Sequence, residues 1–569
     1  MTPVLPRDHG TPDGTPSAAA ADAVTPPLRP FHQGHDVIVV GGGHNGLVCA
    51  CYLARARLRV LVVEAANDVG GCCATVPAAA LGAGVRVNVC TDHIMVHTTG
   101  IVEELELPRY GLRWLPVDPV QVALGWHGET PWIQFRDQAR TLDALDCTHP
   151  EDVDGYRRYL HVAMPAAELV AELASIVPSP GNVARRLLER RGRGLSVLLA
   201  WQRRSAAEVL RGFFGKGLLR ATAAATGPAL WGLPPNASHT GLGALGYAMR
   251  HLAGVARPAG GSGALAHALR ACLLATGRGE VRCDTTVAEV LVDGERVRGV
   301  RTRGGEILEA PIVVAAADPR RVLLGWLTRP PASAARLVAR WQARPRHDGY
   351  QSKLDVVAAT RPRYRALDPW CDTLGADDPL VATMVITPDL SGLVAAHRAA
   401  AGGQVAEQPL ILANVPAALD PAMRPAGSDG QMVSLEVLFT PYQLRDGWRT
   451  TLEPERWLSA YGRLVDPGWH AGVRRWQAMT PPDLEHKLNL ARGYAPSFAG
   501  GPLGALLGRG PELTRYRTPI EGLFLTGAGT YPGASVSGAP GRNTAAVVLA
   551  TIERDRRTGY LPVRLGRST

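Results

Sequence analysis

The 569-residue chain contains few lysines and no long apolar run. Lysine accounts for only 3 of its 61 basic residues, a bias that we attribute to the base composition of the gene. No run of about 18 apolar residues occurs, so we expect no transmembrane helix. The first 16 residues contain no basic segment followed by an apolar one, so we expect no secretory signal. These absences predict a cytoplasmic protein.

Motifs for metal binding and for disulfide exchange are absent as well. The nine cysteines are odd in number, which argues against a disulfide framework and for a reducing compartment. No Cys-x-x-Cys pair occurs, so disulfide-reductase chemistry is not expected. No cluster of histidines, cysteines or acids has metal-ligand spacing, so no metal is expected. Cys72 and Cys73 are adjacent, and a redox disulfide between them stays open as an alternative.

Length and composition bound the organisation of the chain. An ordinary globular composition and this length predict two or three packed units. Residues 1–34 are rich in Pro, Ala, Thr and Gly without apolar periodicity, which predicts a disordered tail. Residues 119–254 have a mainly helical pattern. Further helices are expected at Ala264–Ala275 and Pro540–Asp555, and strands at Thr286–Val292, Arg296–Thr302, Glu306–Ala310, Ile312–Ala317, Leu380–Ile386 and Met432–Phe439.

A strand, a glycine-rich loop, a helix and a second strand follow one another near residue 40. The β-branched run Val37–Val40 precedes Gly41-Gly42-Gly43-His44-Asn45-Gly46, and a helical stretch follows at Leu47–Arg57. A second apolar run, Val60–Val63, ends at Glu64, which stands 18 residues beyond the last glycine. This complete context, and not the glycines alone, predicts a dinucleotide-binding βαβ unit.

Each part of this unit has a physical task in binding a dinucleotide. Gly41 permits the tight turn, Gly43 lets the backbone approach a pyrophosphate, and Gly46 lets the helix pack closely on the strand. The helix begins near His44 and Asn45, and its first turn offers N–H groups and a partial positive charge to the phosphates. Glu64 can accept hydrogen bonds from ribose hydroxyls, and its charge disfavours a 2′-phosphate, so NADP is not expected.

Two further glycine motifs favour FAD over NAD as the cofactor. Gly70-Gly71 follows Glu64 by six residues and would let the chain fold back over a diphosphate. Far along the sequence, a strand runs into a glycine loop at Gly527 and Gly529 and then into the final helix. The N-terminus of that helix would stabilise negative charge on a reduced flavin.

The same motifs carry a resemblance to a known family. The matching segments are 39–50, 91–94, 102–105, 110–112, 249–252, 256–265, 525–533 and 537–543. On these residues the chain resembles the phytoene-desaturase-like branch of the FAD-dependent amine oxidase superfamily. Within that branch it is similar to the flavin type of β-carotene ketolase and to the pyridine nucleotide-disulfide oxidoreductase domain 2-like proteins. The resemblance extends from about residue 35 to about residue 555.

The resemblance implies an α/β fold with a Rossmann-like FAD-binding domain of the glutathione-reductase and amine-oxidase type and an inserted α+β substrate domain. The FAD-binding domain would comprise residues 35–118, 255–329 and 510–560, and the substrate domain residues 119–254 and 330–509. It also implies that the backbone of Val287 contacts the adenine side of FAD. The last motif, with Gly527, Gly529, Ser537 and Gly538, would then lie at the flavin ring.

The family oxidises long, apolar, conjugated substrates, which predicts hydride transfer from a polyene or isoprenoid to flavin N5. Oxygen or a quinone would reoxidise the flavin. This sequence departs from its relatives at residues 493–511, where a glycine-rich stretch with Asn, His and Asp and then Arg-Pro is usual. The departure keeps open a secondary-metabolite dehydrogenase that acts on a carrier-bound polyketide or a small ring. A non-catalytic flavin-fold binding protein is a further alternative.

Catalytic candidates lie close to these motifs. Asp92 and His93 follow the Gly-Gly turn, where the family's chain enters the flavin cavity, and could position substrate or move a proton. A structural His–Asp pair is the alternative. Arg542 could contact a phosphate or the flavin carbonyl edge, or could have a capping or surface role. A covalent flavin link at Cys72 or Cys73 also stays open.

The net charge of +10 is concentrated in one segment. Between Arg185 and Arg220 there are ten Lys or Arg residues and two Glu residues, with apolar side chains between the charges. Such a segment could settle on an anionic membrane surface, which suits a lipophilic substrate. An ordinary helix face whose arginines cover the core is the alternative. No recognition motif accompanies the charge, so nucleic acid is not an expected partner.

Overall fold

A computed structural model describes residues 34–90, 98–370, 375, 378–425, 430–498, 501–507 and 510–557. The chain divides into two units, Met1–Gly34 and His35–Thr569, and the architecture below is that of the second. Apart from Gly34, the predicted disordered tail lies outside the described residues. Among the described residues, no helix combines the length and the apolar character that a membrane span requires.

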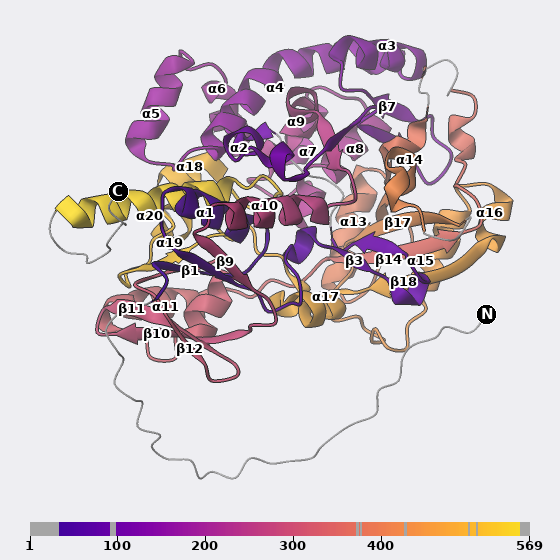
Figure 1. The fold of residues 1–569 in the computed structure, drawn as a ribbon. Helices are drawn as coiled ribbons and strands as arrows, with labels where there is room; N and C mark the ends of the chain where they lie inside the picture. The colour runs from indigo at the N-terminus through magenta and orange to yellow at the C-terminus, as the bar shows by residue number, and fades with distance from the viewer. Residues whose placement is uncertain are drawn as a thin grey trace. The chain divides into compact units, whose positions relative to one another are not determined.

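A five-stranded parallel sheet is built around the predicted βαβ unit (Figure 1). The two predicted strands, β1 (Val37–Val40) and β2 (Val60–Val63), are neighbours in it and pair along their whole length. Every residue of both strands is buried, as continuous apolar runs predict for a parallel sheet that is covered on both faces. The strand order is β19 (Leu523–Leu525), β13 (Ile312–Ala315), β1, β2 and β9 (Gly279–Arg282).

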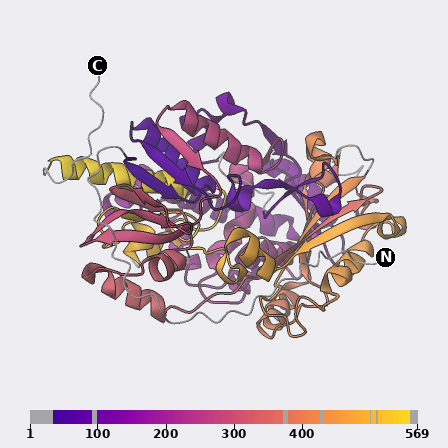
Figure 2. The ribbon, with the colours of Figure 1, turned by 60° about the horizontal axis from the view of Figure 1, so that its bottom comes forward.

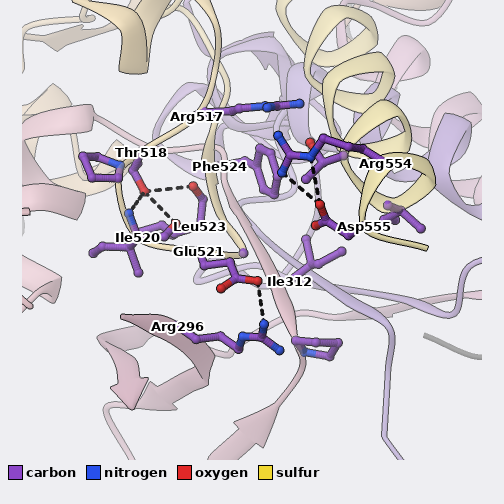
Figure 3. Close-up of a pocket in the computed structure, with 15 residues that line it drawn as sticks. Arg296, Ile312, Arg517, Thr518, Ile520, Glu521, Leu523, Phe524, Arg554 and Asp555 are labelled. Atoms are coloured by element: carbon purple, nitrogen blue, oxygen red, sulfur yellow. Dashed lines mark hydrogen bonds and ion pairs between the residues drawn. The ribbon is translucent and has the colours of Figure 1, made fainter. Parts of the chain in front are cut away.

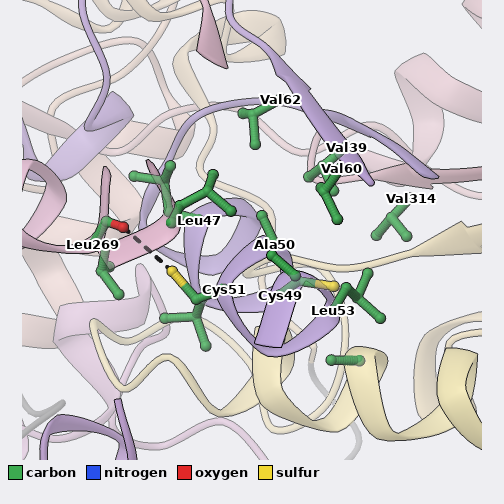
Figure 4. Packing of buried hydrophobic residues seen from close by; sticks show 14 of the residues in the cluster. Val39, Leu47, Cys49, Ala50, Cys51, Leu53, Val60, Val62, Leu269 and Val314 are labelled. Carbon is green, nitrogen blue, oxygen red and sulfur yellow. Dashed lines mark hydrogen bonds between the residues drawn. The ribbon is translucent and has the colours of Figure 1, made fainter. Parts of the chain in front are cut away.

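Helices cover one face of this sheet. They are α1 (His44–Arg55), α10 (Gly263–Ala275) and α20 (Ala539–Arg557), and in both ribbon views α1 and α20 lie side by side (Figures 1 and 2). Alternate strand residues such as Val39 and Val62 share a core with these helices (Figure 4). The apolar faces of these helices thus pack on one face of the sheet and form a buried layer with it.

A second, smaller sheet covers the opposite face. It is antiparallel and consists of β10 (Val287–Asp293), β11 (Arg296–Thr302) and β12 (Ile307–Glu309). The other set of alternate strand residues, which includes Ile38 and Leu61, packs against this sheet. The three strands that we predicted in this part of the sequence are confirmed. The α/β fold class is confirmed as well.

A mixed seven-stranded sheet forms from two parts of the chain, residues 121–134 and residues 351–479. Its order is β18 (Val473–Met479), β14 (Gln351–Ala358), β17 (Gln431–Leu438), β16 (Leu410–Asn414), β15 (Thr383–Ile386), β6 (Gln121–Leu124) and β7 (Trp132–Gln134). Neighbouring strands are antiparallel except for β15 and β6. Large side chains such as Trp457 and Tyr461 of α15 (Glu453–Gly462) cover one face. The domain boundaries that we predicted from the sequence stay predictions.

The structure differs from the sequence-based prediction in two places within this sheet. Residues 119–254 are mainly helical, but they begin with β6 and β7; β6 pairs with β15 far along the chain, and β7 pairs with β6. The strand predicted at Leu380–Ile386 starts only at Thr383, because Pro379–Val381 forms a 3-10 turn whose N–H at Leu380 bonds to Asp378. Pairing between distant segments decides the first difference, whereas a local side-chain cap decides the second.

Helices cover the other face of the seven-stranded sheet. The longest is α4 (Val153–Ala174), which packs with α8 (Leu218–Ala225) and α9 (Gly246–Ala253) around Tyr156, Tyr159 and other buried aromatic side chains. The basic segment, Arg185–Arg220, begins in α5 (Pro180–Glu189). It runs through α6 (Leu195–Trp201) and α7 (Ala206–Arg211) and ends in the first turn of α8.

Candidate functional site

The first glycine loop has the backbone conformation that the motif predicts. Gly41 has φ +110°, a region that favours glycine, and a Cβ atom there would lie 2.7 Å from the carbonyl oxygen of Ala316. A Cβ atom on Gly46 would lie 2.1 Å from the carbonyl oxygen of Gly41. Neither position can hold a side chain in this arrangement, so the glycines bring α1 against the ends of β1 and β13.

The second glycine pair folds back onto this loop. The N–H of Gly70 donates to the carbonyl of Gly42 over 2.9 Å, and Gly43 and Gly70 form a β-bridge. A Cβ atom on Gly43 would meet no atom closer than 4.0 Å, and one on Gly71 no atom closer than 3.5 Å. The two glycine pairs therefore leave open backbone at the N-terminus of α1, as a diphosphate cradle requires.

Glu64 lies beside the loop, at the end of β2. Its carboxylate accepts hydrogen bonds from the N–H groups of Gly42, at 2.7 Å, and Ala66, at 2.8 Å. Each carboxylate oxygen keeps a further lone pair for a ribose hydroxyl. The Glu64 carbonyl accepts from the N–H of Thr285 over 2.8 Å, which places Val287, at the start of β10, close to this acid.

The remote glycine loop ends at the same edge of the parallel sheet. Gly527 follows β19 with φ +105°, and no atom lies closer than 3.9 Å to a Cβ built there. Gly529 packs on Pro319, which a Cβ would approach to 2.7 Å. Ser537 and Gly538 directly precede α20. The N-termini of α1 and α20 lie against each other, since a Cβ on Gly541 would be 2.3 Å from the carbonyl oxygen of Asn45.

Two buried polar atoms at this edge have no hydrogen-bond partner among the described residues. They are Oδ1 of Asn45, in the first turn of α1, and Oγ1 of Thr526, at the end of β19. Buried polar groups normally find a partner, and a bound ligand is one explanation for an exception. Together with the open backbone at Gly43 and Gly527, these atoms fit a dinucleotide bound across the two helix N-termini.

His44 joins the two glycine loops. Its Nε2 lies 3.3 Å from the carbonyl oxygen of Ser535, and its Nδ1 lies 3.4 Å from Sγ of Cys73. Burial lowers the pKa of His44 from 6.5 to about 4, although the bond to Ser535 opposes this shift. The imidazole is therefore neutral near pH 7 and adds no charge to the loop.

The depressed pKa of His44 makes the stability of the fold sensitive to acid. In the unfolded chain the residue titrates near 6.5, whereas in the folded chain it titrates near 4, so the unfolded state binds more protons between these values. Stability should fall as the pH decreases from 6.5 towards 4. Urea midpoints at pH 7 and at about pH 5 should differ less in His44→Asn than in the wild type. The exposed His267 provides the control: if His267→Asn flattened the profile equally, His44 would not be the cause.

The structure places Arg542 in a network of protein contacts. Its Nη1 donates to the Thr99 carbonyl and to Glu104 Oε1, both over 2.8 Å, and its Nη2 donates to the Ser175 carbonyl over 2.9 Å. These contacts tie α20 to α2 (Ile101–Glu104) and to the end of α4, and they favour the structural alternative for this arginine. The other catalytic candidates, Asp92 and His93, lie outside the described residues.

A buried polar row on the seven-stranded sheet was missed by sequence reasoning. The row crosses the strands through Gln134, Gln121, Thr383, Asn414, Ser434 and Asp355, all buried. Arg257 of β8 (Val255–Pro258) donates to Asn414 over 2.6 Å. Beside the row, Lys353 Nζ donates to Asp355 over 2.7 Å and to the carbonyl of Asn88. The sequence did contain a signal for this row. Polar and apolar residues alternate in β14, and one of the three lysines of the chain lies there.

Within the stretch that departs from the family, Ser497 and Phe498 contact the remote glycine loop. The N–H of Phe498 donates to the Ala528 carbonyl over 3.2 Å, and Ser497 Oγ accepts from the N–H of Ala534 over 3.0 Å. The rings of Phe498 and Tyr531 meet edge to face, with centroids 5.7 Å apart. Sequence differences in this stretch therefore bear on the part of the site next to this loop.

A cleft of about 360 Å³ lies elsewhere on the same sheet (Figure 3). Its lining includes Ile312 and Leu523, the first residues of β13 and β19, whereas the glycine loops follow the last residues of their strands. In a parallel sheet the first residues and the last residues of the strands lie at opposite ends of the strands, so this cleft is not the dinucleotide site. Four of its charged side chains are engaged in the pairs Arg296–Glu521, at 2.6 Å, and Arg554–Asp555, at 2.9 Å.

Comparisons with known proteins agree with this geometry. Residues 39–104 match a family model described as an NAD(P)-binding Rossmann-like domain. The chain is 28% identical to pyridine nucleotide-disulfide oxidoreductase domain-containing protein 2 of Mus musculus, across 91% of this chain and 94% of that protein. It is 25% identical to the lycopene-forming phytoene desaturase of Pseudescherichia vulneris, across 91% of this chain and 99% of that protein.

A solved structure of putrescine oxidase, wild type and bound to putrescine, has the same fold. The TM-score is 0.58 at 16% identity, and the match covers 91% of this chain and 99% of that one. The relatives, the Rossmann-like segment and the shared fold all fit one superfamily. The resemblance is therefore confirmed: the chain is similar to oxidoreductases that include phytoene desaturase, contains a Rossmann-like dinucleotide-binding segment and has the fold of putrescine oxidase.

Proposed function

We propose that this chain is an FAD-dependent oxidoreductase that removes hydride from a C–H bond of a lipophilic polyene or isoprenoid. The observation that carries the proposal is the convergence of two glycine loops and two helix N-termini, α1 and α20, at one edge of the parallel sheet. One helix N-terminus serves a diphosphate, and a second one suits a cofactor whose ring gains negative charge on reduction.

The described residues suggest how FAD would be held. The first turn of α1 would bind the diphosphate, Glu64 would accept from ribose hydroxyls, and the backbone of Val287 would contact the adenine. The N–H groups that follow Ser537 and Gly538 would stabilise charge at the flavin edge. When bound, FAD supplies a hydride acceptor at N5. Asp92 and His93 stay candidates for positioning the substrate.

Similarity over almost the whole chain to a phytoene desaturase supports the choice of a lipophilic substrate. Oxygen or a quinone is the proposed electron acceptor, and we propose a cytoplasmic location. Peripheral membrane contact through residues 185–220 is part of the proposal. The burial of its apolar side chains limits which helices of this segment could make that contact. Trp201 and Phe214 point into the core, and the exposed apolar side chains are Leu188, at 79%, and Leu199, at 41%. The contact would therefore involve α5 and α6.

A second candidate keeps the flavin and changes the substrate. The buried polar row on the seven-stranded sheet and the altered stretch at Ser497 and Phe498 both favour a substrate that carries polar groups. A carrier-bound polyketide or a small ring would meet that description. The non-catalytic alternative is the least favoured, because both glycine loops keep the backbone openings that a cofactor needs.

The flavin spectrum separates these candidates. We expect purified protein to be yellow, and we expect a carotene to bleach the flavin band under anaerobic conditions while polar substrates do not. Bleaching by a thioester-bound polyketide and not by a carotene would establish the second candidate. Colourless protein that added FAD does not reconstitute would refute both.

Glu64→Ala tests whether Glu64 binds the cofactor, and the flavin content of the purified variant is the measurement. The variant should lose charge-assisted bonds to the ribose, each of which contributes about 1.5–3 kcal/mol, so Kd for FAD should rise by about tenfold or more. Glu151 is exposed and distant, and Glu151→Ala serves as the control. Equal flavin content in Glu64→Ala and the wild type would contradict the role of Glu64.

A further inference from the structure

Two cysteines that are distant in sequence meet beside the cofactor loop. Strands β3 (Thr75–Pro77) and β4 (Arg86–Asn88) pair antiparallel with Thr75 opposite Asn88, and the N–H of Val89 donates to the Ala74 carbonyl over 2.9 Å. The pairing thus continues past both strand ends and brings Cys90 next to the turn Gly71–Cys73. There the thiols of Cys72 and Cys90 are close enough to act on each other's pKa, and both residues are partly exposed.

The neighbouring thiol of Cys73 is not part of this pair. Cys73 is fully buried, and its Sγ faces Nδ1 of His44 over 3.4 Å. Burial raises its pKa far above the usual range of a thiol, so it stays protonated. The vicinal pair Cys72–Cys73 that the sequence suggested is therefore less suited to redox chemistry than the pair Cys72–Cys90.

The two thiols of the pair differ in their electrostatic surroundings. The neighbouring Cys90 thiol lowers the pKa of Cys72, although burial opposes this effect. Cys72 and burial together raise the pKa of Cys90 well above its ordinary value. Lys353 and Glu436 on the seven-stranded sheet act on Cys90 with opposite signs. Cys72 is thus the nucleophile of the pair, since the thiolate is the reactive form.

We propose that Cys72 and Cys90 form a dithiol site that reduces hydroperoxides and closes to a disulfide. The Cys72 thiolate would attack one peroxide oxygen, so that the O–O bond breaks, an S–O bond forms and water or an alcohol leaves after protonation. Cys90 would then attack the sulfenic sulfur, the S–O bond would break, and hydroxide would leave as water with the Cys90 proton. The two thiols lose two electrons and the peroxide gains them.

The resulting disulfide would join the turn after Gly70 and Gly71 to the end of β4. Reoxidation of a flavin by oxygen would produce hydrogen peroxide at this place, and this source alone rests on the proposed function. The thiol chemistry itself needs no flavin. A protein that lacks flavin and still forms the disulfide would refute the proposed function only, and a yellow protein that does not form it would refute the dithiol site only.

Peptide mapping of the full-length protein tests the site. We expect one equivalent of hydrogen peroxide to lower the count of free thiols, nine in the chain, by two. After alkylation and digestion without reductant, mass spectrometry should find the peptides of Cys72 and Cys90 cross-linked. Dithiothreitol should restore both thiols. No loss of thiols, or a cross-link at any other pair, would overturn the proposal.

Matched controls use the other cysteines. Cys147 is exposed and lies on α3 (Gln138–Thr148), so Cys147→Ser should leave the cross-link intact. Cys51 and Cys272 are buried, and their thiols donate to the carbonyls of Leu269 and Leu105, so we expect them to stay reduced. In Cys90→Ser the cross-link should disappear, and Cys72 should accumulate as sulfenic acid that a dimedone probe labels. An unlabelled Cys72 in that variant would contradict its role as the nucleophile, and the wild-type map decides the case if a variant does not fold.

Discussion

Gly46→Ala is expected to abolish retention of the dinucleotide. The added Cβ would lie 2.1 Å from the Gly41 carbonyl oxygen and 3.1 Å from the Ala316 side chain. Both neighbours belong to the layer that positions the loop, and the closer contact is with backbone, which cannot rotate away. The chain must therefore move α1 away from β1 and β13, and the N–H groups of its first turn move with it.

The expected magnitude follows from this overlap. Forcing a methyl group into a packed site costs about 3 kcal/mol or more when the backbone has to shift. If this free energy destabilises the conformation that binds the cofactor, Kd for the cofactor rises by about a hundredfold. Flavin content after gel filtration and Kd from fluorescence titration would measure the effect.

Gly181→Ala is the matched control for this prediction. A Cβ on Gly181 would meet no atom within 4 Å, and the residue lies in the first turn of α5, away from the loop. This control should bind cofactor as the wild type does. Wild-type flavin content in Gly46→Ala would show that the close approach of α1 to the loop is not needed for binding.

Gly541→Ala is expected to destabilise the whole unit. The added Cβ would lie 2.3 Å from the Asn45 carbonyl oxygen and 3.1 Å from the Cys49 backbone nitrogen, where α20 meets α1. Each of these two helices also packs on the parallel sheet, so neither can move without opening the core that both share. Overpacking of this kind costs about 1–3 kcal/mol.

Urea denaturation should show this cost as a lower midpoint with an unchanged slope. Cofactor affinity should fall as well, because the two helix N-termini lie side by side at the site. Gly468→Ala offers the control, since a Cβ there meets no atom within 4 Å. An unchanged midpoint in Gly541→Ala would mean that the two helices can separate at little cost, which the shared core argues against.

The first prediction involves a residue whose importance could be read from the sequence. Gly41, Gly46 and Glu64 were identified from a strand, a loop, a helix and an acid at known spacing. The pattern is informative because its requirements are local: a positive φ, a close backbone approach and an acid at the end of a strand. The helices and strands with clear apolar periods were predicted for the same reason, and α10, β11 and α20 differ from their predicted bounds by at most a few residues.

Residues that act through distant partners could not be predicted in this way. Lys353 donates to the carbonyl of Asn88, 265 residues away, and Arg542 reaches Glu104 across 438 residues. Cys90 lies beside the turn Gly71–Cys73 only because β3 and β4 pair in one register. A shift of that register by one residue would turn Cys90 to the other face.

The sequence by itself determined the dinucleotide loop, the acid beside it and the fold class, because glycine geometry and apolar periodicity are properties of neighbouring residues. Only the tertiary structure decided that the two glycine loops share one sheet edge, that Arg542 is held by protein carbonyls, that a polar row crosses the large sheet and that Cys90 lies beside the turn that contains Cys72. These facts depend on how sheets order their strands and on which helix faces meet, and packing of the whole chain sets both.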